Sequence, residues 1–220
     1  MNKQTTIETI KKSKIITIVR GVDKSHILDL GKAMLEGGIN CMEITLDQKS
    51  TDGNLNTLNS ISYLCEKLGE RMNVGVGTAM TAEQVRDAAA AGAQYVISPN
   101  VCAAVIEETV KLGLVSIPGA MTPSEIASAY DMGADFVKVF PISNLGADYL
   151  KAVSAPLSHI PLLAVGGVSP ETVADLIKAG ACGFGVGGNI VNKEWISSGK
   201  FDLIAAEARR FRDAVDNATL

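Results

Sequence analysis

The stretch Met132-Gly-Ala-Asp-Phe-Val-Lys-Val-Phe-Pro141 contains the pattern that decides the fold: a helix ends, a glycine follows and a short apolar strand begins. Glycine just past the end of a helix readily takes the left-handed conformation that closes the helix. Alternating apolar residues then predict a strand over residues 135–140. The same junction recurs at four further places: Glu36-Gly-Gly38, Ala91-Gly-Ala93, Leu112-Gly-Leu114 and Ala179-Gly-Ala181.

Repetition of this unit predicts alternating strands and helices. Strands are expected at residues 15–20, 41–46, 73–77, 94–98, 114–118, 135–140, 162–165 and 183–187. Helices are expected at residues 23–36, 54–69, 81–91, 102–112, 123–132, 146–153, 170–179 and 201–216, with an extra N-terminal helix near residues 5–13. Such units favour an α/β fold, a (β/α)₈ TIM barrel, over an open doubly wound sheet. No linker divides the pattern, so residues 1–220 are expected to form a single barrel domain.

Composition and charge argue against several kinds of partner. The chain has 220 residues, of which 47% are hydrophobic and 20% charged, and its net charge is -4. This balance is typical of a globular protein and argues against nucleic acid or an anionic membrane as the main partner. No apolar run reaches the roughly 18 residues that a membrane helix needs, and residues 1–14 lack a signal-peptide pattern. With four scattered cysteines and no C-x-x-C pair, a cytoplasmic location is expected.

Lys138 lies in the middle of the strand expected at residues 135–140. Alternation places Phe136, Lys138 and Phe140 on one face of this strand. Burial disfavours the charged form of a lysine, so its pKa falls and the free amine can form a Schiff base with a carbonyl compound. The alternative is a lysine near a strand end whose amine reaches solvent.

Glu43 is a second polar residue expected inside the barrel. In the strand at 41–46 the even-numbered residues are all apolar and suit the helix layer, which turns the odd-numbered residues, Glu43 among them, toward the lumen. A buried carboxylate is costly unless it is paired or hydrogen-bonded. Glu43 is therefore interpreted either as a general acid–base beside Lys138 or as the partner of that lysine in a structural ion pair.

Other polar groups occur at the carboxyl ends of strands, where barrel active sites gather. Arg20 ends the first strand and could hold a carboxylate or phosphate between its two terminal nitrogens, or it could be an ordinary surface arginine. The third strand reads Val74-Gly-Val-Gly-Thr78: its glycines leave room for close approach, and Thr78 offers a hydroxyl at the rim.

Two glycine pairs predict a phosphate site. Gly166-Gly167 follows the seventh expected strand, and Gly187-Gly188-Asn189 follows the eighth. Loops after these two strands are a recurrent phosphate site of barrels, because exposed backbone N–H groups surround the anion there. A single Gly-Gly is usually only a turn, but two pairs at these positions favour a phosphate or a similar anion.

No metal site is predicted. The two histidines, His26 and His159, lie in no cluster with the spacing of metal ligands, which counts against a zinc-dependent aldolase. Acidic residues could still bind magnesium. No plausible Ser/His/Asp set is present either.

The chain resembles the 2-keto-3-deoxy-6-phosphogluconate (KDPG) and 4-hydroxy-2-oxoglutarate (KHG) aldolase family from about Ile15 to the last helix. The motifs that carry the resemblance are Ile18-Val-Arg-Gly21, Met42-Glu-Ile-Thr45, Val76-Gly-Thr78, Ile97-Ser-Pro99, Ile117-Pro-Gly119, Val137-Lys-Val-Phe-Pro141, Val165-Gly-Gly167 and Val186-Gly-Gly188. The resemblance implies a homotrimeric, metal-independent class I aldolase with no cofactor. Its small-molecule substrate would be a 2-keto-3-deoxy-6-phospho sugar acid, cleaved to pyruvate and glyceraldehyde 3-phosphate, with 4-hydroxy-2-oxoglutarate as another substrate.

The resemblance also implies roles for individual residues. Lys138 would be the Schiff-base lysine and Glu43 the acid–base. The pyruvate carboxylate region would be held by Arg20 and Thr78, with Pro99 and Phe140 lining the pocket. Phosphate would lie against the backbone of Gly166, Gly167, Gly187 and Gly188, with Asn189 as a polar side chain for the anion.

Two positions depart from the gluconate-type pattern. Asp47 stands where many such members have an arginine, so Arg20 would hold the carboxylate alone. Val165 replaces a threonine at the substrate-binding position before the glycines. Its run Ala-Val-Gly-Gly-Val-Ser-Pro-Glu is more similar to 2-dehydro-3-deoxy-6-phosphogalactonate (KDPGal) aldolases. The substrate is therefore expected to be of the phosphogluconate or the phosphogalactonate type.

Two other hypotheses remain open. A phosphate-binding barrel synthase or epimerase of thiamin or tryptophan metabolism would explain the glycine pairs but not the lysine in the lumen. A non-catalytic barrel that senses a keto acid or sugar phosphate would bind its ligand without a covalent adduct.

Overall fold

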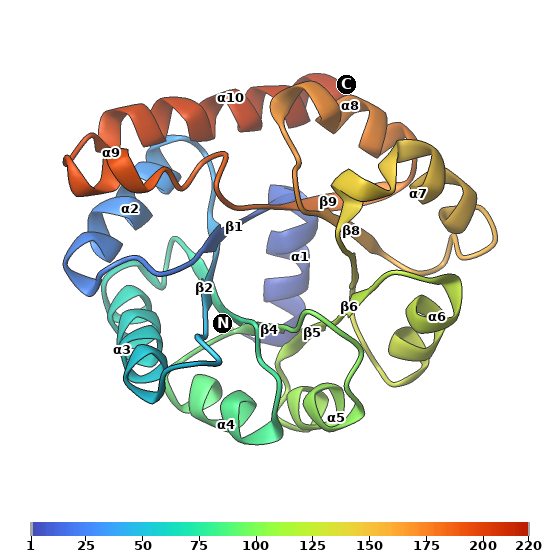
Figure 1. Ribbon diagram of the computed structural model, residues 1–220, viewed down its shortest axis with the longest axis horizontal. Coiled ribbons are helices and arrows are strands. Elements are labelled where there is room, and N and C mark those ends of the chain that lie inside the picture. The colour runs from blue at the N-terminus through green and yellow to red at the C-terminus, as the bar shows by residue number, and fades with distance from the viewer. Residues whose placement is uncertain (1, 220) are drawn as a thin grey trace.

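The computed structural model describes residues 2–219 and consists of a ring of parallel strands surrounded by helices (Figure 1). The strands are β1 (Ile15–Val19), β2 (Cys41–Thr45), β3 (Asn73–Gly77), β4 (Tyr95–Ile97), β5 (Val115–Ile117), β6 (Gly119–Ala120), β7 (Val137–Val139), β8 (Leu162–Val165) and β9 (Ala181–Val186). Their order in the sheet is β5-β4-β3-β2-β1-β9-β8-β7-β6. The predicted α/β barrel is confirmed.

Strand β5 lies within the strand predicted at 114–118, whereas β6 lies just beyond it and was not predicted; together they complete the ring. Only Pro118 separates them, and proline has no N–H to donate to a ladder. Strand β5 pairs with β4, and β6 pairs with β7. At the break, the Lys138 N–H donates to the Pro118 carbonyl at 2.9 Å, so one continuous segment joins both ends of the sheet.

The helices follow the strands as predicted, with small differences at their ends. They are α1 (Lys3–Ser13), α2 (Lys24–Glu36), α3 (Thr51–Leu68), α4 (Ala82–Ala90), α5 (Ala103–Lys111), α6 (Pro123–Asp131), α7 (Gly146–Ser154), α8 (Pro170–Lys178), α9 (Lys193–Ser197) and α10 (Phe201–Thr219). Helix α9 and the 3₁₀ turn η1 (Ile142–Asn144) were not predicted, because they are too short to show a helical period.

The glycine junctions end the helices in the way the sequence indicates. The glycines after α2, α4, α5, α6 and α8 all have positive φ: Gly38 85°, Gly92 96°, Gly113 69°, Gly133 100° and Gly180 104°. Each leads the chain from a helix end back toward the ring.

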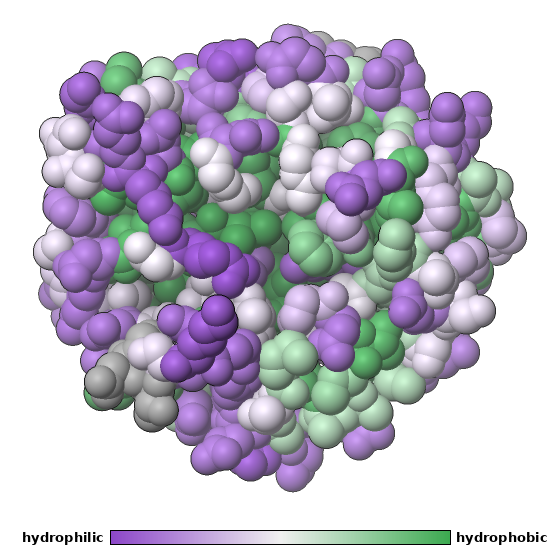
Figure 2. Space-filling model, in the orientation of Figure 1, coloured by the Kyte–Doolittle hydropathy of each residue, from purple (hydrophilic) through white to green (hydrophobic). Residues whose placement is uncertain are grey.

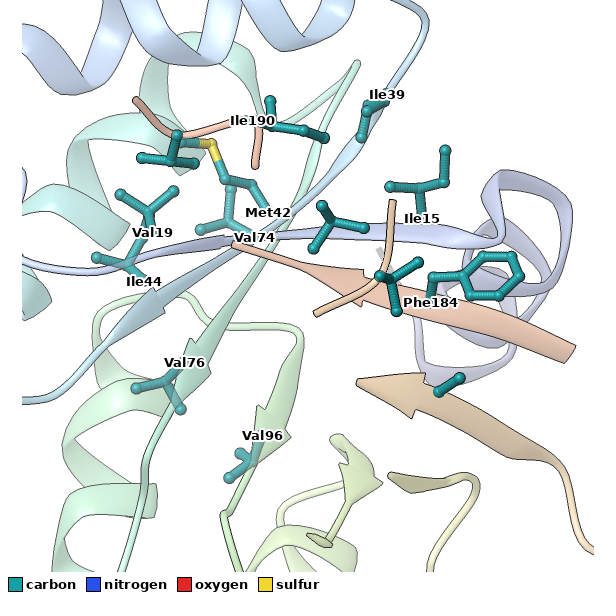
Figure 3. Packing of buried hydrophobic residues seen from close by; sticks show 14 of the residues in the cluster. Ile15, Val19, Ile39, Met42, Ile44, Val74, Val76, Val96, Phe184 and Ile190 are labelled. Carbon is teal, nitrogen blue, oxygen red and sulfur yellow. The ribbon is translucent and has the colours of Figure 1, made fainter. Parts of the chain in front are cut away.

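Two apolar layers lie on opposite sides of the strands. The outer layer, between strands and helices, contains Met42, Ile44 and Leu46 as the alternation predicted, and Figure 3 shows part of it. The lumen holds a second cluster that includes Ile16, Tyr95, Ile97, Val115, Ile117, Phe136, Leu163 and Val165. Ile10 of α1 packs into this cluster, so the extra N-terminal helix covers one end of the lumen. In residues 2–219, no helix has the length and apolar character needed to cross a membrane.

Candidate active site

Lys138 lies at the centre of β7 with its side chain in the barrel lumen. Only 8% of the residue is exposed, and the Phe136 ring on the same face is fully buried. The Lys138 Nζ lies 4.7 Å from the centre of the Phe140 ring. The face predicted for these three residues is confirmed, and the lysine is not a solvated strand-end residue.

Glu43 lies on β2 and is buried, with 2% of the residue exposed. Its Oε2 atom has no hydrogen-bond partner among the described residues. Within residues 2–219, no ion pair within 4 Å joins its carboxylate to the Lys138 amine. The structure therefore does not show the structural ion pair that was one reading of Glu43. It shows two buried ionisable groups that influence each other across the lumen.

Burial sets the protonation of both groups. Desolvation raises the pKa of Glu43, and the nearby charges of Lys138 and Arg20 oppose this shift. Desolvation lowers the pKa of Lys138; the Glu43 carboxylate opposes this shift, and the Arg20 charge adds to it. A lysine with a lowered pKa beside a carboxyl group with a raised pKa is a suitable pair for nucleophilic attack combined with proton transfer.

Gly77 of β3 provides the space for the Glu43 carboxylate. A Cβ atom added at Gly77 would lie 1.6 Å from Glu43 Oε1, and a Cβ at Gly75 would lie 2.2 Å from the Tyr95 ring. The prediction that the glycines of this strand permit close approach is confirmed. Gly77 pairs with Thr45 on β2, and Glu43 lies two positions before Thr45 on that strand. The Cα of Gly77 therefore faces the Glu43 carboxylate.

We expect Gly77→Ala to inactivate the site by displacing Glu43. The overlap should lower the free energy of unfolding by about 1–3 kcal/mol, as overpacked cores usually do. A displacement of about 1 Å should reduce kcat by about 10²-fold. Thermal unfolding and steady-state kinetics measure both effects. Gly77 does not have a positive φ, so only the overlap with Glu43 is expected to act there. Gly113→Ala, where φ is 69° but nothing lies within 4 Å of the added Cβ, is the comparison that shows backbone strain without overlap. Unchanged kcat in Gly77→Ala would contradict this role.

Arg20 and Thr78 meet at the carboxyl ends of β1 and β3. The Arg20 Nη2 donates to Thr78 Oγ1 at 3.2 Å, although 58 positions separate the two residues in the chain. Thr78 has a φ of 61°, and apart from Lys14 it is the only residue of 2–219 other than glycine with positive φ. A β-branched residue rarely takes this conformation, which points to a constraint from its surroundings.

Three further residues surround the lysine end of the lumen. Gly119 pairs with Lys138, and a Cβ at Gly119 would lie 2.5 Å from the Pro99 carbonyl, so Pro99 packs beside the lysine strand. Phe140 is 38% exposed at the mouth, and Val165 is buried in the lumen cluster at 4% exposure. Figure 2 shows an apolar hollow at the centre of the ring, bordered by hydrophilic residues.

The two glycine pairs lie in the loops after β8 and β9. Gly166 and Gly167 have φ of 98° and 73°, and nothing lies within 4 Å of a Cβ added at Gly188. The Asn189 Nδ2 donates to the Val168 carbonyl at 2.7 Å and joins the two loops. Its side-chain amide is thus already bonded to the protein, and binding of an anion by Asn189 stays a prediction.

Asp47 belongs to the loop after β2 and is bonded locally. Its Oδ1 accepts from the Lys49 N–H at 2.9 Å, and its own N–H donates to Asn54 Oδ1 at 2.8 Å. The residue shapes this loop and leaves Arg20 as the cation beside Thr78. Among residues 2–219, no group of three or more His, Cys, Asp or Glu side chains could hold a metal ion.

Three polar residues near the mouth were not predicted as part of the site. Gln48 and Gln84 are hydrogen-bonded to each other at 3.0 Å, and Gln48 also bonds the Thr78 carbonyl. The Lys193 Nζ lies 3.6 Å from a Cβ built at Gly21, so it adds a cation over the β1 loop. The sequence indicates only that Gln84, three residues after Thr81, takes part in capping a helix. A capping position does not reveal the long-range contact with Gln48.

Comparisons with known proteins agree with this geometry. A family model described as KDPG and KHG aldolase matches residues 6–207. The 2-dehydro-3-deoxy-6-phosphogalactonate aldolase of Escherichia coli K12 is 33% identical over 93% of this chain and 97% of its own length. The KHG/KDPG aldolase of the same organism is 29% identical over 100% of this chain and 99% of its own.

A solved structure described as native KDPGal superimposes with a TM-score of 0.84 and 32% identity, covering 93% of this chain and 95% of that chain. The family model spans most of the sequence, and the relatives match along nearly their whole length. The chain belongs to the KDPG and KHG aldolase family, as its motifs predicted.

Proposed function

We propose that this chain is a class I aldolase that cleaves a 2-keto-3-deoxy-6-phospho sugar acid to pyruvate and glyceraldehyde 3-phosphate. The observation that carries the proposal is the buried Lys138 amine in the same lumen as the buried Glu43 carboxyl group. Each group would be more stable in water, and Glu43 Oε2 has no hydrogen-bond partner among the described residues, so their burial in one lumen points to a functional use.

Lys138 is proposed to form the covalent intermediate. Its neutral amine attacks the C2 carbonyl of the substrate and gives a carbinolamine. Loss of water then leaves an iminium joined to the lysine. Glu43 supplies the proton that the leaving hydroxyl needs. The lowered pKa of Lys138 favours attack, and the raised pKa of Glu43 favours proton donation.

Glu43 is proposed to act again when the carbon–carbon bond breaks. Its carboxylate takes the proton of the C4 hydroxyl, the C3–C4 bond breaks, and the electron pair moves into the iminium to give an enamine. The C4 fragment leaves as an aldehyde. The enamine takes up a proton at C3, and water hydrolyses the resulting iminium to pyruvate and free Lys138.

The ends of the substrate are proposed to lie on opposite sides of the mouth. The carboxylate next to C2 would meet Arg20 and the Thr78 hydroxyl, which lie within hydrogen-bond distance of each other. The phosphate would meet the backbone N–H groups near Gly166, Gly167, Gly187 and Gly188. Apolar walls at Pro99, Phe140 and Val165 would limit the access of water to the iminium.

The configuration at C4 is proposed to be that of the galactonate. Where gluconate-type members have a threonine, Val165 offers no hydroxyl for a hydrogen bond to the substrate. Loss of such a contact changes the discrimination between substrates that differ in a hydroxyl group. Pyruvate release from KDPGal and from KDPG, each coupled to lactate dehydrogenase, tests both the aldolase reaction and the configuration at C4. We expect the higher kcat/KM for KDPGal. A preference for KDPG would overturn the configuration only, whereas release from neither would overturn the aldolase proposal.

Metal independence, a homotrimeric assembly and a cytoplasmic location are further expectations. They rest on the resemblance to the family.

A further inference from the structure

Thr78 is held in its unusual backbone conformation by a chain of side-chain amides from two other segments. Gln48, in the loop after β2, donates from Nε2 to the Thr78 carbonyl at 2.7 Å. Gln84, in the first turn of α4, donates from Nε2 to Gln48 Oε1 at 3.0 Å. The other amide atom of Gln84, Oε1, accepts from the Met80 N–H at 2.7 Å.

The orientation of both amides follows from the backbone groups at the two ends. The Met80 N–H can only donate, so it must face the Gln84 oxygen, and the Gln84 NH₂ group then faces Gln48. The Thr78 carbonyl can only accept, so it must face the Gln48 NH₂ group. All donors and acceptors in the chain agree, and neither amide can rotate by 180° without placing two like groups together.

We infer that Gln48 and Gln84 are positioning residues that hold Thr78, and through it Arg20, in the arrangement that binds the substrate carboxylate. The Thr78 hydroxyl, which accepts from Arg20 Nη2 at 3.2 Å, belongs to the residue whose carbonyl Gln48 anchors. Arg20, Gln48 and Thr78 line one cleft of about 610 Å³. The inference deepens the proposed function and rests on it.

Gln84 also has a simpler role, because it occupies the capping position of α4. Its backbone N–H donates to the Thr81 side chain at 3.2 Å, in the spacing of a capping box. Gln84→Glu separates the two roles. Glutamate keeps an oxygen for the Met80 N–H and is favourable near a helix N-terminus, but its carboxylate has no hydrogen to donate to Gln48.

The experiment follows exchange of the pyruvate methyl protons in D₂O by NMR, since this half-reaction needs only the lysine enamine and no aldehyde. We expect Gln84→Glu to unfold at the same temperature as the parent or higher. Its KM for pyruvate should rise about 5–10-fold, the scale of one lost hydrogen bond, with a smaller change in kcat. Gln48→Met, which adds no charge, should raise KM similarly.

Two further variants complete the test. The double variant Gln48→Met, Gln84→Glu should have the KM of Gln48→Met alone, because both residues act through one bond to Thr78. Asn59→Asp adds the same charge at an exposed position of α3 outside this cleft, and its KM should stay that of the parent. Parental KM values in both single variants, with exchange intact, would overturn the positioning role. Absence of exchange in the parent itself would instead overturn the proposed function.

Discussion

Lys138→Met should abolish turnover while leaving the barrel folded. Without the amine no iminium forms, so cleavage should fall by at least about 10⁴-fold toward the uncatalysed rate, from which enzymes commonly differ by about 10⁶-fold or more. Methionine has a similar length and carries no charge to desolvate at this buried position, so we expect the free energy of unfolding to stay the same or increase. Coupled assays of pyruvate release and chemical denaturation measure the two effects.

Lys178→Met is the matched control, because Lys178 is exposed at the end of α8, outside the lumen. It should keep the kcat and the unfolding midpoint of the parent. Cleavage by Lys138→Met within tenfold of the parent would show that another group carries the reaction.

Glu43→Gln should reduce kcat by about 10²–10⁴-fold, the usual contribution of a general acid–base. The amide has nearly the shape of the carboxyl group, so it fits the space that Gly77 leaves, but it cannot exchange a proton. Pyruvate should still bind and form an adduct, because Lys138 and the Arg20–Thr78 pair are unchanged. The adduct should form slowly, because the acid–base is missing. Burst kinetics and the time course of adduct formation separate the two effects.

The pH dependence of the parent provides a second check on Glu43. Because burial raises the pKa of this carboxyl group, it loses its base function as the pH falls through a value above the ordinary carboxyl range. The kcat profile of the parent should therefore show this ionisation on its acid side, and the profile of Glu43→Gln should lack it. Glu107→Gln, an exposed change on α5, should keep the parental profile. A profile identical in Glu43→Gln and the parent would assign the ionisation to another group.

The lumen positions of Lys138 and Glu43 could be predicted because side chains in a strand alternate with a period of two. A charged residue within an apolar strand must then face either the helices or the lumen, and its neighbours decide which. The five glycine junctions were equally informative, since left-handed backbone after a helix strongly favours glycine.

Other features depend on contacts that no local pattern contains. The bond from Gln48 to Thr78 joins residues 30 positions apart and requires the register of two neighbouring strands to be known. The bond from Asn189 to Val168 likewise depends on how two loops approach each other. The break at Pro118 could be expected from the missing N–H. The sequence does not show that β5 and β6, on either side of this break, pair with different neighbours.

Reductive trapping with pyruvate and borohydride, followed by peptide mass analysis, tests the proposed chemistry most directly. A class I aldolase holds pyruvate as an iminium that borohydride reduces to a stable secondary amine. We predict one reduced pyruvate per chain, on the peptide that contains Lys138, and none on the Lys138→Met variant. No adduct under conditions that label a known class I aldolase, or an adduct confined to other lysines, would contradict Schiff-base catalysis by Lys138.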